Sequence, residues 1–198
     1  KLVPKQSTTS KILYSIYFGL TVVETVLLKI AGMPWYDAVI HALSSAGTGG
    51  FSNRNASVGA YGSVAVDLII SVFVLLFSVN FAVYFLLLTR KFRDILASDE
   101  LRFFLTVVAG STLLIAWNIR GLYSSFAQAL RYAVFQVASI ISTTGFATVD
   151  FALWPTFCRM ALVMLMFTGA CAGSTPGGIK ISRVMILCKS LKRELKRL

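Results

Sequence analysis

Charged residues are scarce in this chain of 198 residues: they make up 14% of it, against 57% apolar residues. A soluble domain carries about 25% charged residues, so the composition excludes an ordinary water-soluble globular protein and indicates lipid as the solvent. A disordered chain has few bulky side chains, whereas this one holds 15 Phe, 7 Tyr and 3 Trp. Disorder is therefore excluded except at the two ends.

Cysteine and histidine are few as well. Cys158, Cys171 and Cys188 are an odd number in apolar sequence without metal-site spacing, so we expect free thiols and neither a disulfide framework nor a metal set. The single histidine, His41, is expected to be a helix-packing or interfacial residue and not a pH switch or ligand. Nothing resembles an activated nucleophile or an acid and base pair. We therefore expect no enzyme activity and no organic cofactor.

Basic residues outnumber acidic ones by 19 to 8, which gives a net charge of +11. Fourteen of them lie in three segments that flank the apolar runs, namely Lys1, Lys5, Lys11, Arg90, Lys91, Arg93, Arg102, Lys180, Arg183, Lys189, Lys192, Arg193, Lys196 and Arg197. Successive runs cross a membrane in opposite directions, so these segments emerge on one face, which the positive-inside rule makes cytoplasmic. The distribution of basic residues thus indicates the membrane topology of the chain, and we expect no nucleic-acid partner.

Four apolar segments are long enough, or nearly so, to cross about 30 Å of hydrocarbon as helices. They are residues 12–31, 64–88, 103–119 and 154–191. A shorter helical stretch that breaks at glycine lies between the first and second segments, at 35–46, and another lies between the third and fourth, at 125–141.

We predict an all-α membrane protein of two tandem helix, re-entrant pore-loop, helix units, which together make half of a pseudo-fourfold cation pore. The units are residues 12–89 and 103–191, the latter with a broken last helix. Residues 1–11 and 90–102 are expected to be cytoplasmic linkers, and residues 192–198 a basic cytoplasmic tail.

An internal repeat with an offset of 95 residues relates the two units. The segment HALSSAGTGGF at 41–51 aligns with QVASIISTTGF at 136–146, so that Thr48 falls on Thr143 and Gly50 on Gly145. Hydrocarbon offers no hydrogen bonds, and irregular backbone at membrane depth must therefore be buried in protein or line a watery cavity. One such turn is equally typical of a tight loop between helices, but two matching copies favour a pore.

The turns after the two half-helices are the predicted cation site. A half-helix that ends in the membrane points its negative carbonyl end at an ion, threonine adds a hydroxyl, and glycine permits positive φ. Neither turn holds a carboxylate, which favours potassium over calcium or magnesium. The predicted filter residues are Gly47, Thr48, Gly49, Gly50, Ser142, Thr143, Thr144 and Gly145, with Thr48, Gly49, Thr143 and Thr144 as the metal ligands.

The sequences TGGFS at 48–52, STTGF at 142–146 and GACAGSTPGGIK at 169–180 resemble the Trk/Ktr/HKT superfamily of potassium transporters, and within it the bacterial TrkH-type membrane subunits. The resemblance covers essentially the whole chain. It implies potassium uptake through four such units in one polypeptide, of which these two resemble the second and third, so that the first and fourth units are missing here. It also implies that the protein lies in the bacterial inner membrane, forms a homodimer and binds a cytosolic nucleotide-binding regulatory subunit.

Glycines and a proline interrupt the last apolar segment, and a helix tolerates them poorly, at roughly 1 kcal/mol per glycine and 3 per proline. The resemblance implies that this loop is an intramembrane gate beneath the filter, formed by Ala172, Gly173, Ser174, Thr175, Pro176, Gly177 and Gly178. A passive kink for helix packing is the structural alternative. The 95-residue offset places the loop opposite Ser78, Val79 and Asn80, in what the sequence predicts to be an unbroken helix.

Two other functions stay open at this point. A membrane-integral enzyme acting on lipid-linked phosphate would use the glycine-rich loop and Lys180, although the spacing of a phosphate-binding loop is absent. A structural subunit with a vestigial pore would conduct no ions. Channel-like passage and symport with sodium or protons both fit the sequence. The basic end of the chain suits either anionic membrane lipid or a soluble partner.

Overall fold

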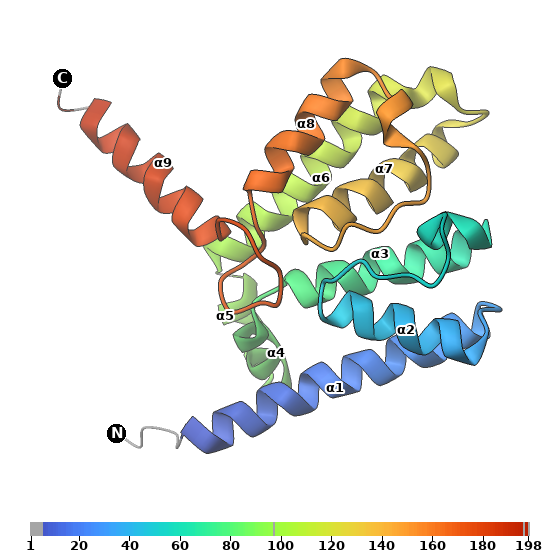
Figure 1. Cartoon of the computed structure of the whole chain (residues 1–198). Helices are drawn as coiled ribbons and strands as arrows, with labels where there is room; N and C mark the ends of the chain where they lie inside the picture. Colours follow the sequence, from blue (N-terminus) through green and yellow to red (C-terminus); the bar gives the residue numbers. More distant parts are fainter. Residues whose placement is uncertain (1–5, 97, 196, 198) are drawn as a thin grey trace.

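The computed structural model describes residues 6–96, 98–195 and 197 (Figure 1). The first unit contains α1 (Gln6–Ile30), α2 (Trp35–Ala46), the 3-10 helix η1 (Ser57–Tyr61), α3 (Val64–Ser78) and α4 (Phe81–Leu88), and α5 (Phe92–Leu96) leads to the second. The second unit contains α6 (Asp99–Ile119), η2 (Arg120–Leu122), α7 (Phe126–Ile141), η3 (Phe151–Leu153), α8 (Thr156–Phe167) and α9 (Ile181–Leu195). The predicted all-α fold, with a helix, half-helix, helix order in each unit, is confirmed.

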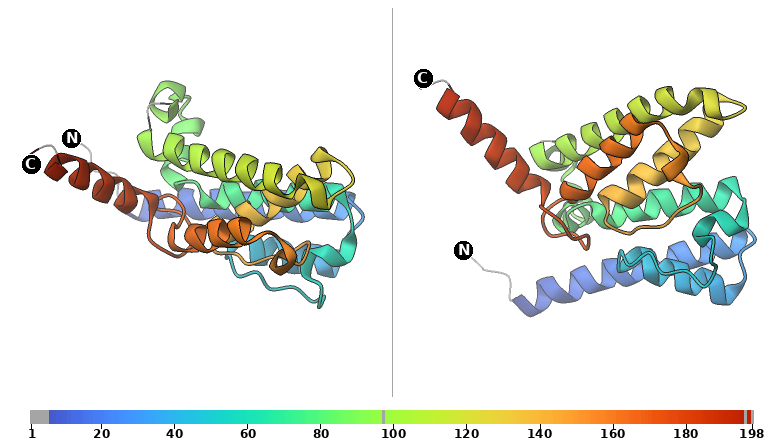
Figure 2. Two further views of the ribbon diagram at one scale, coloured as in Figure 1. Left: turned by 90° about the horizontal axis from the view of Figure 1, so that it is seen from above. Right: turned by 45° about the horizontal axis from the view of Figure 1, so that its top comes forward.

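The two units lie side by side, with α3 of the first against α7 of the second (Figure 1). Both half-helices, α2 and α7, run from one end of the molecule toward its middle, where each gives way to a loop (Figures 1 and 2). The first turn of α1 and the last turn of α9 both lie at the opposite end. This is the arrangement expected for two re-entrant hairpins entering from one face.

Among the described residues, two helices are long and apolar enough to cross a membrane by themselves, Lys11–Ile30 and Asp99–Leu122. The second predicted span is bent by 95° between Val64–Ser78 and Phe81–Leu87. The prediction of an unbroken helix over 64–88 is therefore wrong. The physical reason is that Asn80 starts a new helix, because its side-chain oxygen accepts a hydrogen bond from the Ala82 N–H at 2.9 Å.

The fourth predicted span is divided between α8 and α9. The 12 residues of α8 are too few to cross about 30 Å of hydrocarbon. The chain between the two helices is irregular apart from a parallel bridge that joins Thr168 to Ile179. Beyond it, α9 points away from the two units and carries Lys192 and Arg193 in its last turn (Figure 1).

Serine caps begin the main helices where sequence rules place them. Ser63, Ser98 and Ser125 each accept a hydrogen bond from the backbone N–H three residues on, at the starts of α3, α6 and α7. The half-helices then bury their small side chains: Ala38 and Ala42 on α2, like Ala129 and Ala133 on α7, are fully buried. Small side chains let each half-helix approach its neighbours closely, as membrane-embedded helices require.

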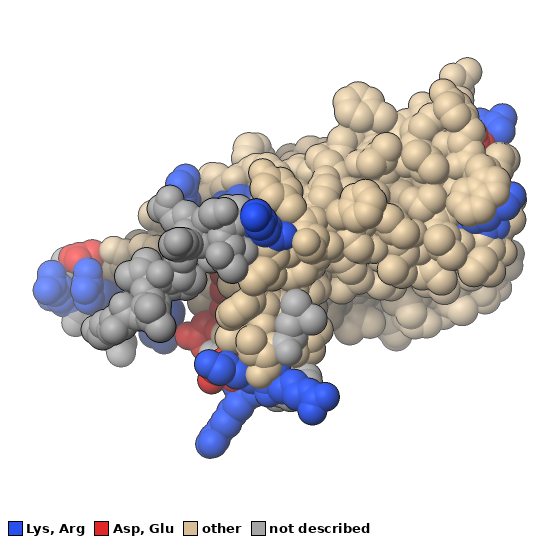
Figure 3. Space-filling view, turned by 90° about the horizontal axis from the view of Figure 1, so that it is seen from below, with Lys and Arg blue, Asp and Glu red and all other residues tan. Residues whose placement is uncertain are grey.

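The surface is divided between apolar and charged regions. Figure 3 shows Lys and Arg gathered toward the two ends, with a broad face between them that is largely free of charged side chains. Large apolar side chains are exposed on the spanning helices, for example Phe18 at 70% and Trp117 at 61%. An exposed apolar belt between charged ends is the surface of a protein embedded in lipid.

Candidate functional site

The two half-helices end in closely matching backbone turns, which we call the first turn (residues 47–50) and the second turn (residues 142–145). Thr48 and Thr143 both adopt left-handed backbone, with φ of 49° and 54°. Gly50 and Gly145 also have positive φ, at 67° and 87°. Threonine rarely occupies this region, so its use at both equivalent positions shows that the repeat extends to backbone conformation.

Hydrogen bonds at the two helix ends match pair by pair. The N–H groups of Gly47, Thr48 and Gly49 donate to the carbonyls of Leu43, Ser45 and Ser44. At an offset of 95 residues, the N–H groups of Ser142, Thr143 and Thr144 donate to the carbonyls of Ala138, Ile140 and Ser139. Each half-helix therefore uses the N–H groups of its own turn to satisfy its last carbonyls.

The turn carbonyls themselves are left without donors. Among the described residues, no hydrogen bond reaches the backbone oxygens of Thr48, Gly49, Thr143 or Thr144. The Gly47 oxygen differs, since it accepts the Thr48 hydroxyl at 2.8 Å. Carbonyls that are not used inside the protein are available to a cation, which is the chemistry that the sequence predicts for these turns.

The two turns touch each other. A Cβ atom added to Gly50 would lie 2.0 Å from the carbonyl oxygen of Thr144, far inside contact distance. The second turn is braced from behind, where the Ser139 hydroxyl donates to the Phe146 carbonyl at 2.6 Å and the hydroxyls of Ser142 and Thr144 lie 2.7 Å apart. The structure thus brings together the predicted residues of both units at one place.

The phenylalanines that follow the turns differ in their surroundings. Phe146 is fully buried against the first unit, and its ring stacks on His41 with centroids 5.7 Å apart. The equivalent Phe51 is 74% exposed. The histidine is held by its own unit, with Nδ1 2.7 Å from the Asp37 carbonyl and Nε2 3.0 Å from the Ser52 hydroxyl. His41 is therefore a packing residue between the units.

The predicted gate residues, 172–178, form a loop that we call the glycine loop, and it lies against the second turn. The Gly177 N–H donates to the Thr143 hydroxyl at 2.9 Å. A cavity of about 270 Å³ opens beside this contact, lined by Ser139, Ile140, Thr143, Gly145 and Met166. The predicted filter and gate residues of the second unit are therefore in direct contact.

Two charged residues hold the glycine loop. The Glu100 carboxylate, in the first turn of α6, accepts a hydrogen bond from the Ala172 N–H at 2.6 Å. The Lys180 ammonium donates to the carbonyls of Ser174 and Pro176. The Lys180 side chain thus stabilises the loop by binding two of its backbone carbonyls.

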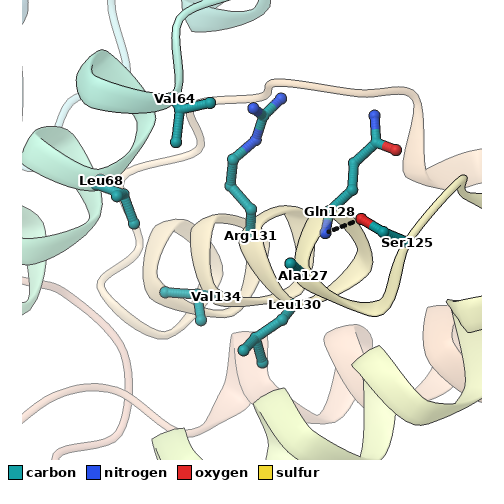
Figure 4. A pocket seen from close by; sticks show the side chains of 8 residues that line it. All are labelled: Val64, Leu68, Ser125, Ala127, Gln128, Leu130, Arg131 and Val134. Atoms are coloured by element: carbon teal, nitrogen blue, oxygen red, sulfur yellow. Dashed lines mark hydrogen bonds between the residues drawn. The ribbon is translucent and has the colours of Figure 1, made fainter.

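An ion pair joins the two units near the start of α3. Arg131 on α7 lies 3.2 Å from the Asp67 carboxylate, and both side chains are largely buried. Arg131 also lines a pocket of about 490 Å³ between α3 and α7. Figure 4 shows Val64 and Leu68 on one side of this pocket and Arg131 on the other. The sequence alone gives Arg131 no partner in the first unit.

A polar network closes the start of the first half-helix. Asp37 accepts hydrogen bonds from Tyr61 at 2.6 Å, from Asn53 at 2.6 Å and from Arg54 at 3.1 Å. The Tyr61 hydroxyl, followed by Asn53 and Arg54, lowers the pKa of Asp37 below its usual 3.8. Burial and the hydrogen bond to Asp37 raise the pKa of Tyr61. The network fixes the loop from residue 53 to residue 61 onto α2.

Sequence analysis missed two residues that contact the glycine loop, Asn80 and Glu100. A signal for Asn80 was present, since the 95-residue offset places it opposite Thr175, and Asn favours helix starts. Glu100 carries no comparable local signal. Its partner, the Ala172 N–H, is backbone that lies 72 residues away.

Comparison with known proteins extends these observations. Residues 1–198 match the family TrkH, described as cation transport protein. Trk system potassium uptake proteins TrkH from Halomonas elongata and Salmonella typhimurium are 38% and 40% identical to the chain over 205 and 203 residues. Trk system potassium uptake protein TrkG from Escherichia coli is 35% identical over 202 residues. These alignments cover 100% of this chain and 41% to 42% of each relative.

The crystal structure of the potassium transporter TrkH from Vibrio parahaemolyticus superposes with a TM-score of 0.92 at 36% identity, over 99% of this chain and 43% of that chain. The chain thus spans less than half the length of the relatives it matches. The family confirms the predicted location in the bacterial inner membrane, and it is described as a transport family and not as an enzyme family, as expected. With a family match along its whole length, the chain belongs to the TrkH family of cation transport proteins.

Proposed function

We propose that this chain forms half of a potassium-conducting pore, in which the first and second turns each supply one quarter of a carbonyl-lined filter. The observation that carries the proposal is the contact of two matching turns in which the Thr48, Gly49, Thr143 and Thr144 carbonyls accept no hydrogen bonds from described residues. A dehydrated monovalent cation needs such oxygens in place of its water shell. The relatives' names, potassium uptake proteins, support potassium as the ion.

The unequal surroundings of equivalent residues support a ring of four units. Phe146 packs on the first unit, whereas its counterpart Phe51 is 74% exposed. Gly50 is pressed against Thr144 of the second unit, whereas a Cβ atom on its counterpart Gly145 would meet nothing within 4 Å. Across this junction, the second unit presents Phe146 to the first, and the first presents Gly50 to the second. We propose that the exposed Phe51 and the open Gly145 make the equivalent contacts with the two units of the complete transporter that precede and follow this pair.

The glycine loop is proposed to be the gate. It lies directly against the second turn, where the Gly177 N–H donates to Thr143 at 2.9 Å. A loop at this place obstructs an ion that leaves the turn toward the cytoplasmic end. The dense hydrogen bonding of the loop to α3, α4 and α6 supports a specific closed position over a passive kink.

Further elements of the proposal come from the resemblance in sequence. We propose that the complete transporter is a homodimer and that it binds a cytosolic nucleotide-binding regulatory subunit. The basic residues of α9, at the cytoplasmic end of the molecule, offer charge to such a subunit or to anionic membrane lipid. Light scattering of the purified transporter in detergent, with and without the soluble subunit, tests both assemblies.

The contacts of Lys180 argue against an enzyme that acts on lipid-linked phosphate. Its ammonium donates to the Ser174 and Pro176 carbonyls within the loop. A phosphate site needs this charge to point at the ligand, together with free N–H groups. The N–H groups of Ala172 and Gly177 are already bonded to Glu100 and Thr143.

Ion selectivity tests the proposed filter. In the complete transporter reconstituted in liposomes, Gly145→Ser should reduce the preference for potassium over sodium. The preference is measured by how strongly each of the two ions competes with ⁸⁶Rb⁺ uptake. The substitution forces serine into backbone with φ of 87° and moves the turn carbonyls. Gly121→Ser is the matched control, because Gly121 lies in η2 and has open space around it. Unaltered uptake and selectivity in the Gly145 variant would contradict the filter.

Loop length tests the proposed gate. Shortening residues 172–178 should raise ⁸⁶Rb⁺ flux through the complete transporter, because the obstruction below the second turn is removed. A pore that stays closed in this variant would count against the gate.

A further inference from the structure

The bend between α3 and α4 changes the partners of four backbone groups. In a continuous helix, the Phe81 and Ala82 N–H groups donate to the carbonyls of Phe77 and Ser78. In the structure, the Phe81 N–H donates to the Gly173 carbonyl at 3.1 Å, and the Ala82 N–H donates to the Asn80 side chain at 2.9 Å. Both donors have therefore exchanged a helical partner for another one.

The two carbonyls released by the bend bind the glycine loop and the residue before it. The Ser78 carbonyl accepts from the Cys171 N–H at 3.1 Å. The Phe77 carbonyl accepts from the Thr175 hydroxyl at 3.2 Å. Backbone groups within a membrane protein must be paired, so bend and loop each satisfy groups that the other leaves free.

Close packing reinforces this exchange at one residue. Gly173 has φ of 67°, and a Cβ atom added to it would lie 3.1 Å from the Asn80 side-chain oxygen. Asn80 thus caps α4 and contacts the loop at the same time. The bend also gains support from Tyr84, whose hydroxyl donates to the Leu76 carbonyl at 2.6 Å.

The internal repeat shows that the two interruptions are equivalent. The 95-residue offset places Ser78 on Gly173 and Asn80 on Thr175, so the second long helix of each unit is interrupted at the same point. The short interruption of the first unit is hydrogen-bonded to the long interruption of the second. The backbone groups of α3 and α4 would be paired in either of two arrangements. In one, the helices are bent and the loop is bound. In the other, they form one straight helix and the loop is released.

We propose that the bend at Val79 and Asn80 is the seat that holds the glycine loop closed, and that straightening of α3 into α4 releases the loop. This inference rests on the proposed role of the loop as gate. Asn80 is a positioning residue, because it stabilises the bent arrangement and touches no ion. The bent and straight forms are a two-state element whose balance sets how often the loop is released.

Replacement of Asn80 tests the seat. Asn80→Leu removes the cap and favours a continuous helix, whereas Asn80→Ser keeps a capping oxygen. In liposomes with the complete transporter, we expect Asn80→Leu to raise basal ⁸⁶Rb⁺ flux on the order of fivefold, the effect of losing one helix cap. Asn80→Ser should stay near the unmodified level, and the potassium over sodium preference should be unchanged in both. A general packing defect would lower flux or selectivity.

A second variant acts from the side of the loop. Thr175→Val keeps the shape of the side chain but removes the hydroxyl that donates to Phe77, so we expect it to raise flux in the same direction. Thr25→Val is its control, since the Thr25 hydroxyl donates to the Thr21 carbonyl within α1. This pair keeps the test valid if the Asn80→Leu protein does not fold.

The outcomes separate this inference from the proposed function. Flux that is unchanged in Asn80→Leu or, where that protein does not fold, in Thr175→Val, together with raised flux in the loop-shortened transporter, would overturn the seat and leave the gate intact. Absence of ⁸⁶Rb⁺ uptake by the unmodified transporter would overturn the proposed function itself.

Discussion

Gly50 lies against the carbonyl oxygen of Thr144, so closely that a methyl group on its α-carbon would be 2.0 Å from that oxygen. The two residues belong to different units and are separated in sequence by the rest of the first unit, the linker and the part of the second unit that precedes the second turn. Their contact fixes the first turn against the second. It also explains why glycine is needed at this position for space as well as for its φ of 67°.

Gly50→Ala is expected to destabilise the protein more than the same change at a comparable glycine. Gly62 also has left-handed backbone, at φ of 56°, but has open space around it. Gly62→Ala should cost about 1 to 2 kcal/mol from backbone strain alone. Gly50→Ala should cost at least about 2 kcal/mol more, since its methyl overlaps backbone that cannot rotate away. Equal melting temperatures of the two variants in detergent would contradict the contact.

The ion pair between Arg131 and Asp67 should stabilise the junction of the two units. Its side chains are 17% and 4% exposed, so Arg131→Met leaves a buried carboxylate without a partner and should cost about 3 to 5 kcal/mol. Lys189 and Asp99 form an exposed pair at 3.8 Å, and Lys189→Met should cost less than about 1 kcal/mol. Chemical unfolding measures both. A similar, small effect of the two substitutions would show that the inter-unit pair is unimportant.

Asp37 should make the stability of the loop from residue 53 to residue 61 depend on acid pH. Its hydrogen bond from Tyr61, with those from Asn53 and Arg54, lowers its pKa below 3.8. Its contribution to stability is therefore fully present above about pH 3.8 and declines as the pH falls toward the lower pKa of the folded state. At neutral pH, the unmodified protein should have a higher melting temperature than the Asp37→Asn variant. The difference between the two melting temperatures should shrink only below about pH 3.8.

Tyr61→Phe provides the control for this pH dependence. It removes the largest cause of the lowered pKa, so the loss of stability in acid should be smaller and should be complete at a higher pH than in the unmodified protein. A melting temperature whose acid dependence is the same in all three proteins would show that the network does not act on Asp37.

The two threonines at the tips of the half-helices should differ in their effect on gating. Thr143 accepts a hydrogen bond from the Gly177 N–H at 2.9 Å, whereas the Thr48 hydroxyl donates within its own turn at 2.8 Å. Thr143→Val should therefore loosen the glycine loop and raise basal ⁸⁶Rb⁺ flux. Thr48→Val should leave basal flux less affected. The reverse order would mean that the loop is not held through the second turn.

Local sequence was sufficient to predict the half-helices and the turns. The repeat aligned Thr48 with Thr143 and Gly50 with Gly145, and the structure gives both pairs the same positive φ. Such turns are determined within about ten residues, by small and polar residues that end a helix. The same is true of the serine caps at Ser63 and Ser125.

The bend at Asn80 could not be predicted in the same way. Apolar residues continue across it from α3 into α4, so the segment has the composition of a single span. The groups that stabilise the bend come from the other unit, at Cys171, Gly173 and Thr175. The ion pair of Arg131 with Asp67 depends likewise on how the units pack, which sequence periodicity does not report.

Anomalous scattering from Rb⁺ or Tl⁺ tests the central claim most directly. Crystals of the complete transporter grown with either ion should show a peak between the first and second turns, within coordination distance of the backbone oxygens of Thr48, Gly49, Thr143 and Thr144. Replacing Gly145 with serine should weaken that peak. An ordered filter without a peak there, or a peak bound elsewhere while ⁸⁶Rb⁺ uptake continues, would contradict the account.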